Sequence, residues 1–344
     1  MYRYHCGTSI RKPKGLENEA HDALSDAVFP EGLVLDLTTE DFDKMASIAP
    51  KWDQEYLQFG KGRFKGHLLG IHTNRIQIGK VTWDPGILVR GSTPPRSITL
   101  AMLLHRSGAA SCQGLPLEES HIMVLEPGQE FEITLQGKST LLVVAVAEEL
   151  FWSHAHALWG EPFVLTDSRD RLVVCQTPTP EAVREEWAKR VTDIACDGTL
   201  LTKFSLAQSL EKDILEQILR NARGPRPCPP GAYRRQAAKR AEEYLITNAK
   251  KPVSLADLCT AAKANERTLL LGFHEVFGMP PKQYLKSLRL NRVRQDLLRA
   301  SHDTTVTDVA THWGFTHLSR FAADYREMFG ALPHETLKNR WKSE

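Results

Sequence analysis

The sequence lacks the long apolar runs that membrane proteins require. Its longest apolar stretch, residues 141–147, has the length of a strand and is far shorter than the roughly 18 residues of a membrane-spanning helix. The first residues contain no apolar core of a secretion signal. We therefore expect a cytoplasmic protein that does not interact with a membrane.

Closely spaced cysteines are also missing. The six cysteines stand at positions 6, 112, 175, 196, 228 and 259, and no two have the Cys-x-x-Cys spacing of a metal site. Scattered single cysteines are typical of reduced, partly buried thiols. The Gly-x-Ser-x-Gly nucleophile motif is absent as well, which argues against a hydrolase. We expect no enzymatic activity and no cofactor.

Net charge is close to balanced, but its distribution is uneven. The whole chain carries 44 Lys and Arg against 42 Asp and Glu, whereas residues 232–344 carry 19 against 12. A basic C-terminal part on an acidic body favours a polyanionic partner at the C-terminal end.

Residues 30 to about 175 have the pattern of a β domain. Short apolar runs recur between turn signals such as Asp84-Pro-Gly and Glu126-Pro-Gly, a spacing typical of a β-sandwich or small barrel. A helix is expected near residues 39–48. Aromatic residues are predicted to lie in the core of this domain; they are Trp52, Tyr56, Phe59 and Phe64.

Residues 176–222 switch to helical spacing. One apolar stripe contains Val183, Trp187, Val191 and Ile194, and a second contains Leu206, Leu210, Ile214 and Ile218. The two stripes predict a helical hairpin that packs on the β domain, forms a dimer interface, or does both. Residues 223–231 hold four prolines in nine positions, which predicts an extended linker.

After this linker the chain is helical and contains an internal repeat. Residues 254–259 align with residues 305–310, and residues 273–281 align with residues 325–333. Ser254 and Thr305 are predicted N-caps, each with an aspartate three positions later. A short helix, a turn and a longer helix in each copy predict two helix-turn-helix motifs, at about 254–275 and 305–328.

The second helix of each motif has a candidate DNA-reading face. We predict Thr316 as the N-cap of the second of these helices, and Leu318 on its inward face. The predicted outward residues are Arg267, Thr268, Leu271 and His274 in the first motif, and Ser319, Arg320, Ala323 and Arg326 in the second. Small residues and arginines on one face suit a helix in a major groove.

Residues 236–337 resemble the DNA-binding domain of the AraC/XylS family of bacterial transcription regulators. The stretch from Asp308 to Pro333 carries the resemblance, with its Ala-x-x-x-Gly-Phe turn and the later Phe, Gly and Pro. The amino-acid sequence of this stretch is similar to that of the ethanolamine-utilisation regulator subgroup. The resemblance implies a helix at about 281–300 that joins the motifs and places both reading helices roughly one DNA turn (~34 Å) apart.

The resemblance also implies the rest of the organisation. The expected fold class is α+β, with a cupin-like effector domain at 1–175, the hairpin at 176–222, the linker at 223–231 and the all-α DNA-binding domain at 232–344. The implied partners are double-stranded DNA, a small-molecule effector, RNA polymerase for an activator, and a second copy of the chain. Four histidines of the first domain lack the His-x-His and following Glu of a metal cupin, so no metal is expected; they are His67, His72, His105 and His121.

Two features depart from the family pattern. Lys263 stands in the first turn, where the family usually has Gly; either Lys adopts a left-handed conformation there, at a cost of roughly 1–2 kcal/mol, or the turn differs. Leu270 and Leu271 replace polar residues, so Arg320 and Arg267 are expected to carry most base readout. The alternatives are a DNA-repair alkyl-transfer protein, which needs a zinc-held cysteine cluster, and a protein-binding module without DNA affinity.

Overall fold

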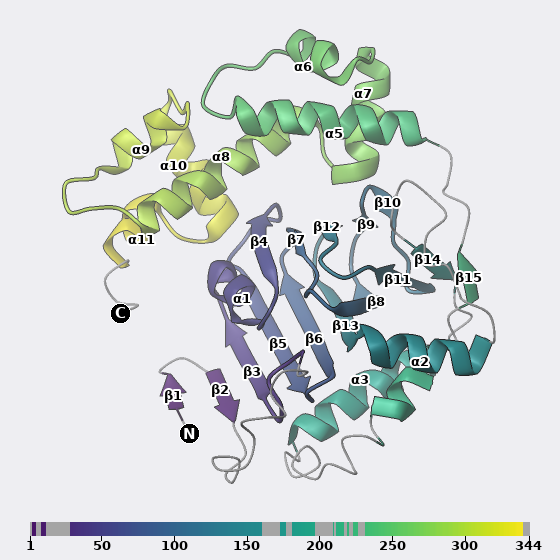
Figure 1. Cartoon of the computed structure of the whole chain (residues 1–344). Coiled ribbons are helices and arrows are strands. Elements are labelled where there is room, and N and C mark those ends of the chain that lie inside the picture. The colour runs from purple at the N-terminus through teal and green to yellow at the C-terminus, as the bar shows by residue number, and fades with distance from the viewer. Residues whose placement is uncertain are drawn as a thin grey trace.

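The computed structural model describes residues 2–4, 8–11, 28–159, 173–176, 181–196, 209, 211–216, 219, 223–225 and 231–339. Strands dominate before residue 226, and only helices follow from residue 232 on within the described part (Figure 1). The predicted α+β class, with a β domain before an all-α domain, is confirmed. No helix of the described residues is long and apolar enough to cross a membrane.

The β domain consists of two antiparallel sheets. The larger has the order β1-β2-β3-β5-β6-β13-β8-β11-β14-β15, and the smaller has the order β10-β9-β12-β7-β4. The strands of the larger sheet are β1 (Tyr2–Tyr4), β2 (Thr8–Arg11), β3 (Val34–Thr39), β5 (Lys65–His72), β6 (Ile76–Asp84), β8 (Ser97–Arg106), β11 (His121–Leu125), β13 (Ser139–Ala147), β14 (Val173–Gln176) and β15 (Arg223–Pro225). Those of the smaller sheet are β4 (Asp53–Gln58), β7 (Ile87–Ser92), β9 (Ala110–Cys112), β10 (Leu115–Pro116) and β12 (Glu130–Leu135).

The facing sides of the two sheets form one apolar core. Val81 and Leu141 of the larger sheet are buried together with Val89 and Ile133 of the smaller one. Of the predicted core aromatics, Tyr56 and Phe64 are buried in this core and the half-buried Trp52 packs on it. Phe59 is also buried, but it packs on Tyr284 of the C-terminal helices instead. Of the two arrangements that the strand spacing left open, a sandwich or a small barrel, the structure has two facing sheets, as in a sandwich.

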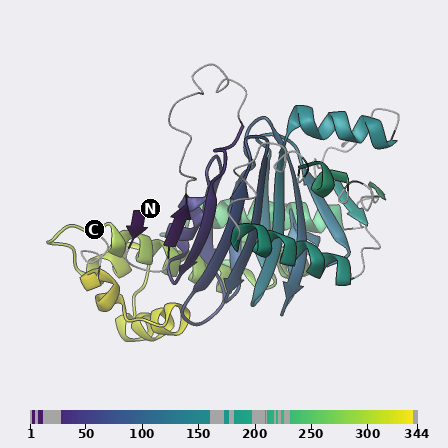
Figure 2. The same cartoon turned by 90° about the horizontal axis from the view of Figure 1, so that it is seen from below.

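The described part of the β domain also contains helices. Those with defined bounds are α1 (Phe42–Ile48), which the sequence predicts, α2 (Glu148–Trp159), which it does not, and α3 (Glu181–Cys196); residues 211–216 are helical as well. On α3, Trp187, Val191 and Ile194 are buried against the outer face of the larger sheet (Figure 2). This stripe thus packs on its own domain. Of the second predicted stripe, Ile214 joins the same cluster, and Leu206, Leu210 and Ile218 lie outside the described residues.

The first three residues of the predicted linker are part of the sheet. Arg223–Pro225 is extended, as its proline favours, but it forms β15 and pairs with β14. Residues 226–230 lie outside the described part.

The C-terminal domain contains seven described helices. They are α5 (Ala232–Thr247), α6 (Leu255–Ala262), α7 (Glu266–Phe277), α8 (Pro281–Leu298), α9 (Val306–His312), α10 (Leu318–Phe329) and α11 (Pro333–Asn339). The layer of α5 and α8 covers the smaller sheet, on the side away from α2 and α3 (Figure 1). Leu57 and Leu88 of the sheet are fully buried among apolar residues of α5, α7 and α8.

A buried charge cluster joins the two domains. The Arg90 guanidinium on β7 donates to Glu132 Oε2 at 2.8 Å and to the Tyr284 hydroxyl at 2.9 Å, and it pairs with Glu242 of α5. Lys239 of α5 pairs with Glu132 and Glu242. Burial raises the pKa of Glu242, and neighbouring Glu132 raises it further while Lys239 and Arg90 oppose the shift. The two cations therefore favour the charged form of the Glu242 carboxylate.

A second contact joins α8 to β4 through backbone groups. Asn291 is fully buried in α8; its Oδ1 accepts from Gln58 N at 3.0 Å and its Nδ2 donates to Gln58 O at 2.9 Å. The Gln58 side chain donates in turn to Met328 O at the end of α10. One asparagine thus binds both polar backbone groups of a residue in the other domain.

Asn291→Ala should lower the free energy of unfolding by about 2–4 kcal/mol. The substitution leaves a buried N–H and C=O of Gln58 without this partner, and each unsatisfied group costs about 1–3 kcal/mol. Urea unfolding followed by circular dichroism measures the change. Gln283→Ala, at an exposed position of the same helix, is the control for helix propensity. A loss no larger than that of the control would contradict the role assigned to Asn291.

Candidate nucleic-acid interface and interior cavity

The first helix-turn-helix unit is formed by α6 and α7. Ser254 caps α6 in a full capping box with Asp257, and hydrogen bonds from the Ser254 hydroxyl and backbone N–H lower the pKa of the Asp257 carboxyl. The helix ends at Lys263, whose φ of 51° and ψ of 44° are left-handed. The backbone conformation expected of this turn is therefore present, although the residue is not glycine. Asn265 then caps α7 by accepting from Thr268 N at 2.9 Å.

Helix α7 has one buried and one exposed face. Leu269, Phe273, Val276 and Phe277 are buried in the domain core. A Cβ on Gly272 would lie 2.3 Å from Arg234 O of α5, so glycine allows the two helices to approach closely. Of the predicted outward residues, Arg267, Leu271 and His274 are exposed and Thr268 is half-buried.

The second unit is formed by α9 and α10. Thr305 caps α9 by accepting from Asp308 N, as predicted, and Gly314 in the turn has a φ of 81°. The prediction of Thr316 as the next N-cap is wrong, because α10 begins at Leu318 with His317 at its N-cap. Phe315 still belongs to the turn after α9, because its N–H donates to Ala310 O. Its ring packs on the Phe321 ring, with 4.8 Å between the ring centroids.

The faces of α10 largely follow the prediction. Phe321, Tyr325, Met328 and Phe329 are buried. Leu318 is 39% exposed, contrary to prediction; it opens the helix, so it lies beyond the end of the buried stripe. All four predicted outward residues of this helix are exposed, namely Ser319, Arg320, Ala323 and Arg326.

The two units are held together by α8, which runs from Pro281 to Leu298 close to the predicted joining helix. Arg289 donates to Ala249 O at 2.6 Å and to Lys251 O at 2.7 Å, just after α5. Trp313, in the turn of the second unit, donates to Asp296 Oδ2 at 2.6 Å and lies under the Lys250 ammonium. Sequence reasoning did not assign these positioning roles, because each partner is distant in the chain.

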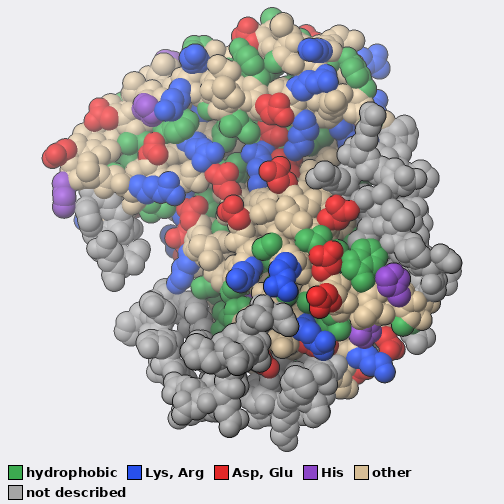
Figure 3. All heavy atoms as spheres, viewed as in Figure 1, with side chains coloured by type: hydrophobic (Ala, Val, Ile, Leu, Met, Phe, Trp, Pro, Cys, Tyr) green, Lys and Arg blue, Asp and Glu red, His purple; other side chains and the backbone are tan. Residues whose placement is uncertain are grey.

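The exposed arginines of α7 and α10 have no internal partner. Among the described residues, none makes a hydrogen bond or ion pair with the guanidinium of Arg267 or of Arg320. In contrast, charged groups of both signs lie side by side where the helical layer meets the sheets (Figure 3). The two arginines are therefore available to an external anion or hydrogen-bond acceptor.

Comparisons with known proteins agree with this geometry. A family model described as a helix-turn-helix domain matches residues 258–339. The probable thc operon regulatory protein of Rhodococcus erythropolis is 36% identical over 115 residues, which are 33% of this chain and 33% of that protein. The XylDLEGF operon transcriptional activator of Pseudomonas putida is 35% identical over 101 residues, 29% of this chain and 32% of its own length. The match thus spans about a third of these relatives.

A solved structure of a probable AraC family transcriptional regulator from Rhodopseudomonas palustris is 34% identical and covers 30% of this chain and 96% of its own, with a TM-score of 0.29. The C-terminal domain is a helix-turn-helix domain similar to those of these operon regulators. Within this domain, the exposed residues of α7 and α10 are the candidate interface with nucleic acid.

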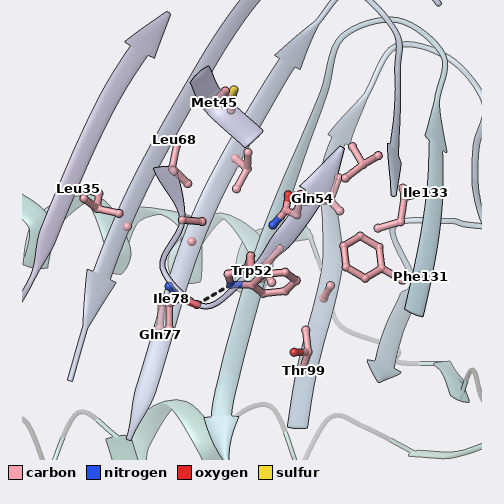
Figure 4. Close-up of a pocket in the computed structure, with 18 of the residues that line it drawn as sticks. Leu35, Met45, Trp52, Gln54, Leu68, Gln77, Ile78, Thr99, Phe131 and Ile133 are labelled. Atoms are coloured by element: carbon pink, nitrogen blue, oxygen red, sulfur yellow. Dashed lines mark hydrogen bonds between the residues drawn. The ribbon is translucent and has the colours of Figure 1, made fainter. Parts of the chain in front are cut away.

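The β domain that precedes the helix-turn-helix domain contains an interior cavity of about 80 Å³ between its two sheets (Figure 4). Apolar side chains from both sheets and from α1 line most of it, among them Leu68, Val89, Phe131, Leu141 and Met45. Two of the aromatics assigned to the core, Trp52 and Tyr56, therefore also form walls of a cavity.

A chain of hydrogen bonds fixes the polar part of the cavity wall. Trp52 Nε1 donates to Gln77 Oε1 at 2.6 Å, and Gln77 Nε2 lies 3.1 Å from His72 Nε2. Because the Gln77 oxygen faces Trp52, its amide nitrogen donates to His72, whose Nε2 must then be unprotonated. Burial lowers the pKa of His72 to about 4, in agreement with a neutral ring. Among the described residues, no group of three or more potential metal ligands clusters.

Lys263→Gly should raise the free energy of unfolding by about 0.5–1 kcal/mol. Glycine removes the roughly 1–2 kcal/mol cost of a left-handed Lys, although its greater freedom in the unfolded chain offsets about 0.5–1 kcal/mol. Chemical denaturation of the full chain measures the gain. Lys263→Ala retains a Cβ and should gain nothing; an equal gain in both variants would show that the backbone conformation is not the cause.

Stability should fall by about 2 kcal/mol between pH 7 and pH 5 because of His72. Its pKa is about 4 in the folded protein and ~6.5 in the unfolded chain, so the unfolded state binds more protons in this window and is favoured as the pH falls. Urea unfolding at both pH values in wild type and His72→Gln measures the contribution. His105→Gln is the matched control, because His105 is exposed. If both substitutions reduced the pH dependence of the free energy of unfolding equally, the assignment of this dependence to His72 would be wrong.

Proposed function

We propose that this protein is a sequence-specific DNA-binding transcription regulator that responds to a small-molecule effector. The observation that carries the proposal is the pair of helix-turn-helix units on one joining helix, each with an exposed arginine whose guanidinium has no partner among the described residues. Helices α7 and α10 would enter adjacent major grooves of one face of the duplex, about one DNA turn apart.

Within this proposal, Arg267 and Arg320 read bases. A guanidinium can donate two parallel hydrogen bonds to the O6 and N7 of guanine, which discriminates by about 1–3 kcal/mol against another base. Ser319 and Ala323 are small, so α10 can lie deep in the groove beside Arg320. Leu271 is suited to contact with a thymine methyl group, Arg326 and His274 to phosphates, and the half-buried Thr268 to positioning.

The unequal composition of the two reading faces supports unequal roles. Alongside Arg267 and Thr268, α7 presents Leu271, which is 45% exposed and can give only apolar contact. The face of α10 combines Arg320 with a serine hydroxyl. The second unit is accordingly proposed to supply more base readout and the first unit more positioning.

Response to an effector needs a physical connection between the cavity and the DNA-binding helices. Strand β4 offers one, because successive side chains of a strand point to opposite faces. Gln54 and Tyr56 line the cavity. Glu55 pairs with Arg292 of α8 at 2.8 Å, and Leu57 is buried among the C-terminal helices. A ligand that shifts β4 would therefore shift α8, which sets the relation between α7 and α10.

Further partners are part of the same proposal. A relative from Pseudomonas putida is named a transcriptional activator, which supports activation through RNA polymerase for this chain. Homodimerisation would let two copies read a longer site, and the protein would act in the cytoplasm, where the DNA of a bacterium is.

The alkyl-transfer alternative needs a thiolate acceptor, and the described cysteines do not offer a metal-held one. Cys112, Cys196 and Cys259 are free thiols. Burial raises the pKa of Cys112 to about 12, so this thiol stays protonated at neutral pH and is not a nucleophile.

Arg320→Ala should reduce the affinity for a specific site by about tenfold to a hundredfold, the loss of one bidentate contact, and change the affinity for random DNA only slightly. Fluorescence anisotropy at a fixed salt concentration, with a site recovered by genomic binding of the full chain, measures both. Wild-type affinity for either DNA should fall as salt rises.

Arg190→Ala is the control, because Arg190 is a half-buried arginine on α3, outside the C-terminal domain, that pairs with Glu186. It should leave both affinities unchanged. Equal losses on specific and random DNA in the Arg320 variant would assign this residue to phosphate contact instead. Absence of salt-dependent binding in wild type would favour a protein-binding module over a DNA-binding one.

A further inference from the structure

The cavity of the β domain is unusual in carrying polar groups without any formal charge. Its polar lining comes from glutamine, threonine, tyrosine, tryptophan and histidine, and Asp, Glu, Lys and Arg are absent from the described residues that line it. A carboxylate or ammonium ligand placed there would lose its hydration without gaining a counter-ion, which is strongly unfavourable.

Several polar groups of the wall have no hydrogen-bond partner among the described residues and are open to a ligand; His72 Nδ1, Trp83 Nε1 and Thr99 Oγ1 are among them. Thr99 is fully buried on β8, and its Oγ1 has no hydrogen-bond partner among the described residues. Figure 4 shows its side chain directed toward the Trp52 ring, with Gln54 beyond it. The Gln54 amide also makes no hydrogen bond to another described residue. A buried hydroxyl without a partner costs free energy in the folded protein, so a ligand that satisfies it gains by doing so.

The size of the cavity limits the ligand further. An apolar cavity of about 150 Å³ in another protein admits benzene, whereas this one has about 80 Å³. A ligand of one ring therefore needs a small displacement of the wall. Trp52 can provide it, because it is half-buried, precedes β4 and is held on its polar edge by the single bond to Gln77.

We propose that this cavity binds a neutral organic molecule of about one ring, with a hydroxyl or carbonyl oxygen that hydrogen-bonds to Thr99. The inference rests on the proposed function only in treating the ligand as the effector; binding itself does not depend on DNA. Aromatic or cyclic neutral compounds are the class that fits, and carboxylates, phosphates and amines are excluded by the uncharged wall.

Three probes test the chemistry with the full chain. Phenol carries the hydroxyl, toluene has a methyl group in its place and nearly the same shape, and benzoate carries a carboxylate. Isothermal titration calorimetry at neutral pH should show that phenol binds most tightly. Toluene should bind about fivefold more weakly, because it lacks one neutral hydrogen bond. Benzoate should not bind. Benzoate binding as tightly as phenol, or no binding of either neutral probe, would overturn the proposal.

Two variants locate the site. Thr99→Val keeps the shape but removes the hydroxyl, so it should weaken phenol about fivefold, leave toluene unchanged and raise the melting temperature of the unliganded protein. Gly79→Val fills the cavity, because a Cβ at Gly79 meets only ordinary contacts at 3.7 and 3.8 Å; it should abolish binding of both probes. Phenol binding that both variants retain would place the site elsewhere and overturn the proposal.

The DNA anisotropy assay on the same preparations separates this inference from the proposed function. Sequence-specific DNA binding without any probe binding would refute the ligand class alone. Probe binding that follows the expected order, in a protein without DNA affinity, would refute the regulator and leave the site in place.

Discussion

The arrangement of this protein depends on the burial of Arg90 between its two domains. A guanidinium taken out of water must be surrounded by acceptors, and here they come from both sides: Glu132 from the β domain, and Glu242 and Tyr284 from the helical domain. The Lys239 ammonium pairs with both Glu132 and Glu242 and so supplies a second positive charge for the two carboxylates. Because no single domain satisfies all these groups, the helical layer must dock on the smaller sheet in this one orientation.

Docking at Arg90 also decides what lies on each side of the smaller sheet. Its outer face packs on the helices through Leu57 and Leu88, its edge strand β4 binds α8 through the Gln58 backbone and Asn291, and its inner face closes the cavity. Strand β4 therefore belongs to the cavity and to the support of the DNA-binding helices at once. Helix α8 in turn fixes both helix-turn-helix units, through Arg289 and through the Trp313–Asp296 bond.

Local features of the C-terminal domain were predictable because they depend on residues close together in the chain. The caps at Ser254 and Thr305 follow from hydrogen bonds within a few residues, whereas the conformation at Lys263 was left open. Thr316 and Leu318 were assigned wrongly, since where α10 begins depends on how Phe315 packs on Phe321. The DNA contacts of the exposed residues stay a prediction.

The sequence by itself determined the two-domain α+β organisation, the duplicated helix-turn-helix units and the faces of α7 and α10, because periodicity and capping are short-range. Only the tertiary structure decided that Arg90, Glu132 and Glu242 meet, that α3 covers the larger sheet, and that Thr99 and Gln54 face one uncharged cavity. These groups are distant in sequence, and nothing in their local pattern selects one partner over another. Their pairing is set by the packing of whole sheets and helices, which alone brings them within hydrogen-bond distance.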